Sequence, residues 1–159
     1  MTRKKSNYKP KPVRADTLTY VIQGLRLVND TGSVALDLKI KNHSCLEALR
    51  TGQASRQDMD AIIAALNVCE ALCRLGTGHE YIEEVKQGQN SLLELSRRGI
   101  DRDDRFVAKA QELTDINYAY EVHDAQLDVC TIAQLEKALD LVEREIRARR
   151  ATVIEEKVS

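Results

Sequence analysis

Both prolines of the chain, Pro10 and Pro12, lie near its beginning, and no proline follows over the next 147 residues. A proline inside a helix removes a backbone hydrogen bond and clashes with the preceding turn. Its absence therefore leaves every later segment free to be helical. This distribution predicts an all-α fold for the chain beyond Pro12.

The composition indicates how such helices would pack. Apolar residues make up 43% of the 159 residues and charged residues 31%, which is typical of a globular chain. Aromatic residues make up only 4%, with Phe106 the single Phe, so the core must be built from Leu, Ile, Val and Ala. We predict one helical domain at 15–150, preceded by a disordered basic tail at 1–14 and followed by a frayed end at 151–159.

Within this domain, apolar residues recur at intervals of three and four, which places them on one face of a helix. The clearest stripe follows Ser55, which forms a capping-box pattern with Asp58, and four alanines thicken it. We therefore expect this helix to be central. The spacing predicts an antiparallel bundle of five to six helices. The expected helices cover approximately 16–28, 33–50, 55–75, 79–98, 105–127 and 131–150.

The segment 34–40 is open to a second interpretation. Its apolar residues alternate, which taken alone is the pattern of a strand. The same stretch continues through Cys45, Leu46 and Leu49 at helical spacing, and a lone strand would leave its backbone groups unpaired. We predict one helix from Ser33 to Arg50, closed by Gly52.

Glycines and acidic residues suggest the helix ends in the second half of the chain. Gly88 lies inside the fourth predicted helix and indicates a kink or two shorter helices, and Gly99 is expected to end it. Asp103 or Asp104 can cap the fifth helix. That helix would carry Phe106 on its apolar face, together with Val107, Ala110, Leu113, Ile116, Ala119, Tyr120, His123 and Leu127.

The last predicted helix begins at Thr131, with Gln134 completing a capping box. Its apolar stripe is narrow and nearly heptad-spaced, so this helix is expected to pack on the outside of the bundle. The stripe consists of Ile132, Leu135, Leu139, Val142 and Ile146.

The charge of the chain is unevenly distributed. The first 14 residues hold six basic residues and no acidic one, and because the total is −1, the other 145 residues carry −7. Such a tail can bind phosphates without sequence preference, which makes nucleic-acid binding an alternative function, although the acidic body argues against a large nucleic-acid surface. The candidate contacts are Arg3, Lys4, Lys5, Lys9, Lys11 and Arg14.

Three short polar stretches interrupt the apolar pattern, and they contain His43, Asn67, and His123 with Gln126. If these stretches face one another, they form a buried polar network or a pocket. A network that fixes the register of the helices is the favoured interpretation. A small-molecule pocket is a second alternative function.

No catalytic signature or metal-ligand pattern is present, so we expect neither an enzyme nor a metal or cofactor. The four cysteines lack a C-x-x-C pair and are expected to be buried free thiols. No stretch is long enough for a membrane span and no secretory signal is visible, which predicts a cytoplasmic protein.

Three runs resemble one group of known proteins: Ile40-Lys41-Asn42-His43, the stretch 64–72 and the stretch 121–128. The chain is similar over 8–150 to short helical proteins of unknown function that bacteriophages and mobile elements of Gram-negative bacteria encode. The resemblance implies no reaction and no site residues. It implies a bacterial setting in which small accessory proteins bind host proteins. We therefore expect a non-enzymatic interaction protein that binds a host or phage protein, or itself as a homodimer.

Overall fold

The structure is a computed structural model that describes residues 27–28 and 33–148. This part of the chain is all-α and contains five α-helices and one 3₁₀ turn. The elements are α2 (Ser33–Arg50), α3 (Arg56–Arg74), η2 (His79–Tyr81), α4 (Ile82–Ile100), α5 (Ala110–Val129) and α6 (Ile132–Arg147).

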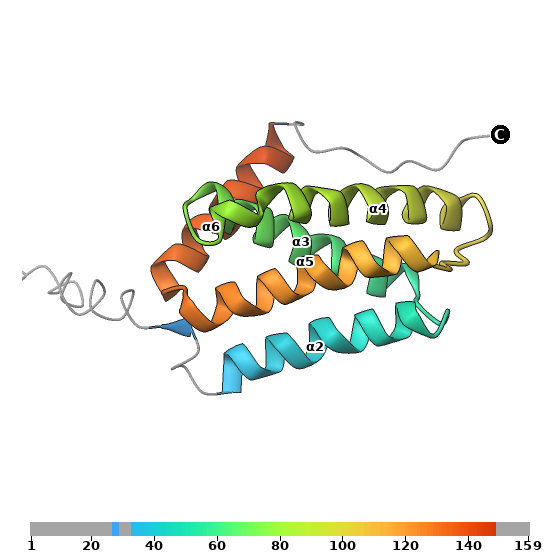
Figure 1. Ribbon diagram of the computed structural model, residues 1–159, viewed down its shortest axis with the longest axis horizontal. Helices are drawn as coiled ribbons and strands as arrows, with labels where there is room; N and C mark the ends of the chain where they lie inside the picture. Colours follow the sequence, from blue (N-terminus) through green and yellow to red (C-terminus); the bar gives the residue numbers. More distant parts are fainter. Residues whose placement is uncertain (1–26, 29–32, 149–159) are drawn as a thin grey trace, which may run out of the picture.

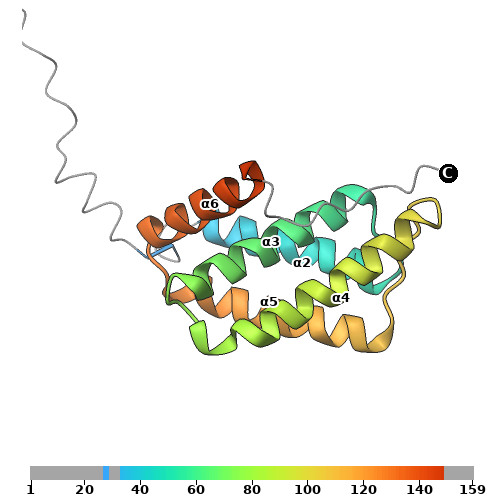
Figure 2. The same ribbon diagram turned by 90° about the horizontal axis from the view of Figure 1, so that it is seen from above.

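Each of the helices α3, α4 and α5 runs antiparallel to the helix before it (Figure 1). Helix α6 crosses these helices obliquely at one end. Helix α3 contacts all four of the other helices, which makes it the centre of the fold, as the sequence predicts. Helix α6 runs alongside the half of α3 that ends at Arg74 (Figure 2). The predicted antiparallel bundle is thus confirmed for the described residues.

Helix α3 is central because of its sequence. The Ser55 hydroxyl accepts from the backbone N–H of Asp58, and the Asp58 carboxylate accepts from the N–H of Ser55, which completes the predicted capping box. Its buried side chains occupy more than one face, so neighbouring helices can pack around it. They are Met59, Ile62, Ala65, Leu66, Cys69, Ala71, Leu72 and Cys73.

The segment 34–40 is helical, because α2 begins at Ser33 and continues without a break to Arg50. Gly52 follows with a φ of 72°, the left-handed conformation that suits glycine after a helix. The predicted first helix at 16–28 lies outside the described residues except for its end, and there the prediction is wrong. Leu27 forms a single β-bridge with Thr131, and the N–H of Val28 donates to the carbonyl of Cys130.

Helix α4 differs from the prediction at both ends. It starts at Ile82, after the 3₁₀ turn, and continues through Gly99 to Ile100. Gly88 causes no break, because a Cβ there would lie 2.8 Å from the Cβ of Ala119, so the glycine allows α4 and α5 to approach closely. A Cβ at Gly99 would lie 2.2 Å from the Phe106 ring. Both glycines are therefore packing residues within the helix.

The fifth helix begins later than expected. Asp103 and Asp104 adopt left-handed φ values of 55° and 60° and belong to a turn, so neither caps a helix. Phe106 then lies in a loop with 2% of its surface exposed and packs into the main core. Helix α5 starts at Ala110, where the Glu112 carboxylate accepts from the N–H of Lys109. The predicted first turn of this helix is therefore a loop at 105–109, which places Phe106 in the core.

Helix α6 begins as predicted, with Thr131 and Gln134 forming a reciprocal capping box. Ala138 is its one fully buried residue, and Leu139 and Ile146 remain 49% and 56% exposed. The helix therefore packs on the outside of the bundle, as the narrow stripe predicts. The predicted frayed end lies outside the described residues.

Candidate functional site

The predicted site residues fall into separate places. The basic tail residues Arg3 to Arg14 lie outside the described part of the chain. His43 lies on α2, Asn67 on α3, and His123 and Gln126 on α5. Asn67 and Cys69 point in nearly opposite directions, because each residue of an α-helix turns about 100°. Cys69 faces α5, whereas Asn67 bonds to Gln89 of α4, so Asn67 does not join the two histidines.

His43 contributes to the seam between α2 and α5. Its Nε2 lies 2.6 Å from an Asp124 carboxylate oxygen, and its ring meets the Tyr120 ring edge-on at 5.9 Å between centroids. One turn away, Lys39 pairs with Asp128 in the same antiparallel register. The half-exposed His43 therefore stabilises the seam, and it does not line either groove described below.

Three buried polar atoms along this seam lack a hydrogen-bond partner among the described residues. They are Nδ2 of Asn42, the hydroxyl of Tyr120 and Oδ1 of Asp124. Burial raises the pKa of Tyr120, so its phenol is neutral at physiological pH. Such atoms are usually satisfied by ordered water.

Gln126 is the centre of a buried network between α5 and the end of α3. Its amide nitrogen donates to the backbone carbonyls of Cys69 and Thr77, at 3.1 and 2.8 Å, and to Sγ of Cys73 at 3.2 Å. Its amide oxygen faces Nδ1 of His123 at 3.4 Å. Burial lowers the pKa of His123, which keeps the ring neutral. Because the amide oxygen of Gln126 can only accept, Nδ1 is the donor in this contact. This network fixes the register of α5 on α3.

The four cysteines behave as predicted. All are free and buried, and Cys69 and Cys73 lie within the network around Gln126. Within the described ranges, no group of three or more His, Cys, Asp or Glu side chains is arranged to hold a metal ion. Among the same residues, no helix has the length and apolar character needed to cross a lipid bilayer.

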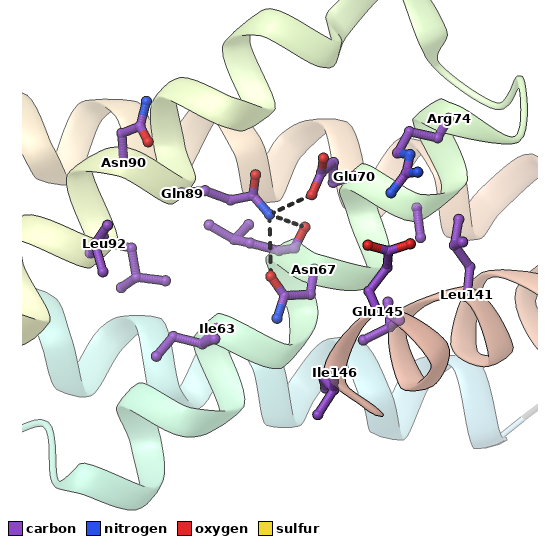
Figure 3. A pocket seen from close by; sticks show the side chains of 14 residues that line it. Ile63, Asn67, Glu70, Arg74, Gln89, Asn90, Leu92, Leu141, Glu145 and Ile146 are labelled. Carbon is purple, nitrogen blue, oxygen red and sulfur yellow. Dashed lines mark hydrogen bonds between the residues drawn. The ribbon is translucent and has the colours of Figure 1, made fainter. Parts of the chain in front are cut away.

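A groove lies between α3, α4 and α6. Its volume is about 320 Å³, and it is partly open to solvent (Figure 3). Apolar side chains from all three helices line it beside polar ones. The apolar residues are Ile63, Leu66, Ala71, Leu92, Leu93, Leu141, Val142 and Ile146, and the polar residues are Asn67, Glu70, Arg74, Gln89, Asn90 and Glu145.

The hydrogen bonds of Gln89 determine which amide atoms face this groove. Its nitrogen donates to the Glu70 carboxylate at 3.1 Å, to Oδ1 of Asn67 at 3.2 Å and to the carbonyl of Leu66 at 3.5 Å. A carboxylate and a backbone carbonyl can only accept, so the nitrogen of Gln89 must point toward them. The Asn67 oxygen then faces Gln89.

This orientation leaves one donor and one acceptor available. Nδ2 of Asn67 and Oε1 of Gln89 form no hydrogen bond with any described residue, and Figure 3 shows each pointing away from the other side chain. Asn67 and Gln89 are only partly buried and both line the groove. The groove therefore offers an N–H donor and a carbonyl acceptor between apolar walls.

A smaller cavity of about 110 Å³ lies between α3, α4 and Phe106, closer to the start of α3. Ile63 lines both cavities, and the second one adds Met59, Ser96, Ile100 and Phe106. The two cavities therefore lie one after the other along α3, with Ile63 between them.

Sequence reasoning identified Asn67 and the apolar stripe of the last helix, which supplies Val142 and Ile146 to the groove, but it missed Gln89 and Glu70. Gln89 lies next to the apolar Leu92 and Leu93 in the fourth predicted helix, and nothing in its own surroundings distinguishes it from a solvent-exposed glutamine. Only the packing of α4 against α3 brings it to Asn67. No local signal could have indicated this pair.

No protein-family model matches the chain, and neither does any curated protein or solved structure.

Proposed function

We propose that this protein is a non-enzymatic interaction protein that binds a segment of a partner protein in the groove between α3, α4 and α6. The amide pair of Asn67 and Gln89 between apolar walls carries this proposal. The resemblance to phage and mobile-element proteins supports a bacterial host protein as the partner.

The amide pair matches the chemistry of a peptide backbone. Each non-proline residue of a partner offers one N–H and one carbonyl, which Oε1 of Gln89 and Nδ2 of Asn67 can bind. A helical partner uses most of these groups internally, whereas an extended segment leaves them free. The surrounding Ile63, Leu93 and Val142 can then contact apolar side chains of the same segment. We therefore infer an extended, apolar segment as the bound form.

The two alternatives have less support. The small-molecule alternative requires His43, Asn67 and His123 to share one pocket, and Asn67 faces away from the other two. The nucleic-acid alternative rests on the tail residues alone, and the body beyond them carries the −7 charge.

The proposal can be tested by selecting linear peptides from a random display library on the full-length protein. Selected peptides should be apolar at alternate positions. Asn67→Ala should weaken their binding about tenfold, since a lost hydrogen bond to a backbone group costs about 1.4 kcal/mol in this setting. Gln89→Leu should have a similar effect.

Asn117→Ala is the matched control, because Asn117 is also half-buried but lies on α5 and does not line the groove. Binding to this variant should be unchanged. The proposal is wrong if no peptide is selected, or if the selected peptides bind Asn67→Ala and Gln89→Leu as tightly as the unmodified protein. Thermal unfolding of each variant checks that the fold is retained.

A further inference from the structure

Helices α2 and α5 lie side by side (Figure 1), and the seam between them contains a cluster of buried polar atoms. The amide nitrogen of Asn42, the hydroxyl of Tyr120 and Oδ1 of Asp124 form no hydrogen bond with any described residue. Asn42 and Tyr120 are only 5% and 1% exposed, so these two side chains are closed off from bulk solvent. An unpaired buried polar group is costly, and three of them on one seam indicate a bound molecule.

Contacts across the seam bring the three side chains together. His43 is next to Asn42 in the sequence, and its ring contacts Tyr120 and the other carboxylate oxygen of Asp124. Tyr120 and Asp124 are four positions apart on α5, so their side chains are neighbours on one face of the helix. Asn42 and Cys45 are neighbours in the same way on the buried face of α2. Burial raises the pKa of Tyr120, and Cys45 and Asp124 raise it further, so its hydroxyl lies within electrostatic range of both helices.

We propose that Asn42, Tyr120 and Asp124 form a binding site for one buried water molecule that joins α2 to α5. The hydrogen-bonding groups match those of water. The Asn42 N–H and the Tyr120 O–H can donate to its oxygen, and one of its hydrogens can be donated to Oδ1 of Asp124. Three polar partners are the usual number for a buried water. None of the three residues lines the groove, so this site is separate from the one proposed for a partner segment.

Charged ligands fit these groups less well. A metal or ammonium ion would be attracted by Asp124, but the Asn42 nitrogen would direct its N–H toward the cation. An inorganic anion could accept from Asn42 and Tyr120, but the Asp124 carboxylate would repel it. A neutral molecule that both accepts and donates satisfies all three groups at once.

Oxygen-17 magnetic relaxation dispersion tests the proposal, because it counts the water molecules that remain bound far longer than surface water. The full-length double variant Asn42→Leu with Tyr120→Phe should hold about one long-lived water fewer than the unmodified protein, since the new side chains form no hydrogen bond. An equal count in the two proteins overturns the proposal.

The matched control is Asn117→Leu with Tyr118→Phe. It makes the same two changes on α5, where Asn117 is partly buried and Tyr118 is 41% exposed. The count of long-lived waters should stay at that of the unmodified protein. A loss equal to that of the seam variant would show that the effect is not specific to the seam, which also overturns the proposal. Circular dichroism checks that each variant retains its helices.

A crystal structure of the unmodified full-length protein decides the question if the seam variant does not fold. It should show one ordered water within about 3.2 Å of Nδ2 of Asn42, the hydroxyl of Tyr120 and Oδ1 of Asp124. A direct hydrogen bond from the Tyr120 hydroxyl to Asp124, with no water between the helices, overturns the proposal. A metal ion at the same point overturns it as well.

Discussion

Replacing Gly99 by alanine tests the close packing of Phe106 against α4. Gly99 is helical, and alanine at a helical position is normally favoured over glycine by about 1 kcal/mol. Here the new Cβ would lie 2.2 Å and 2.6 Å from two ring carbons of Phe106. Carbon atoms attract at about 3.5–4.0 Å, so the ring would have to move by more than 1 Å.

Phe106 has little freedom to move, because it is 2% exposed and packed into the main core. Overpacking of this kind costs about 1–3 kcal/mol, and a rigid ring favours the upper value. After the helix-propensity gain, we expect Gly99→Ala to lower the free energy of unfolding by about 2 kcal/mol. For a chain of this size, this is a fall of about 4–8 °C in Tm.

Urea unfolding followed by circular dichroism measures this change. In a Phe106→Ala background, which is itself less stable by about 3–5 kcal/mol, the clash is absent and Gly99→Ala should raise stability by about 1 kcal/mol. Gly88→Ala is the matched control, because its clash is with Ala119 and should persist in both backgrounds. The reasoning is refuted if Gly99→Ala is neutral in the unmodified protein, or equally harmful in both backgrounds.

Three further predictions concern the polar contacts. A double-mutant cycle on His43→Ala and Asp124→Ala should give a coupling free energy of unfolding of only about 0.5 kcal/mol, because His43 is half exposed. A coupling near zero would show that the pair does not stabilise the seam. Glu112→Gln should lose about 2 kcal/mol at pH 7, because Glu112 accepts two hydrogen bonds from Arg98. Hydrogen bonding from Arg98 lowers the pKa of Glu112 in the folded state, so its contribution is complete above the unfolded pKa of about 4.3 and is lost as the pH falls through the lower folded value. The difference from the unmodified protein should therefore shrink in urea unfolding below about pH 4, and a constant difference down to pH 2 would contradict this assignment. Gln126→Leu should cost about 2 kcal/mol in thermal unfolding, since two backbone carbonyls lose their donor, and an unchanged Tm would show that the network is dispensable.

Much of the fold follows from local patterns. The helix at Ser33–Arg50 has the bounds that its apolar spacing predicts, and the capping residues Ser55 and Thr131 lie where predicted. These features succeed because capping and helix periodicity depend on residues three or four positions apart. The polar residues were harder to place, since hydrogen-bond partners such as Asn67 and Gln89 are 22 positions apart.

The sequence by itself determined that the described chain is helical, that α3 is central and that α6 lies outside, because proline placement and the width of each apolar stripe act within one helix. Only the tertiary structure decided that Gly99 stays inside a helix and that Phe106 leaves one, because both depend on the contact between them. It also decided that Asn67 meets Gln89 and not His123. The direction of a side chain around a helix can be read from sequence, but the helix that it meets is set by packing.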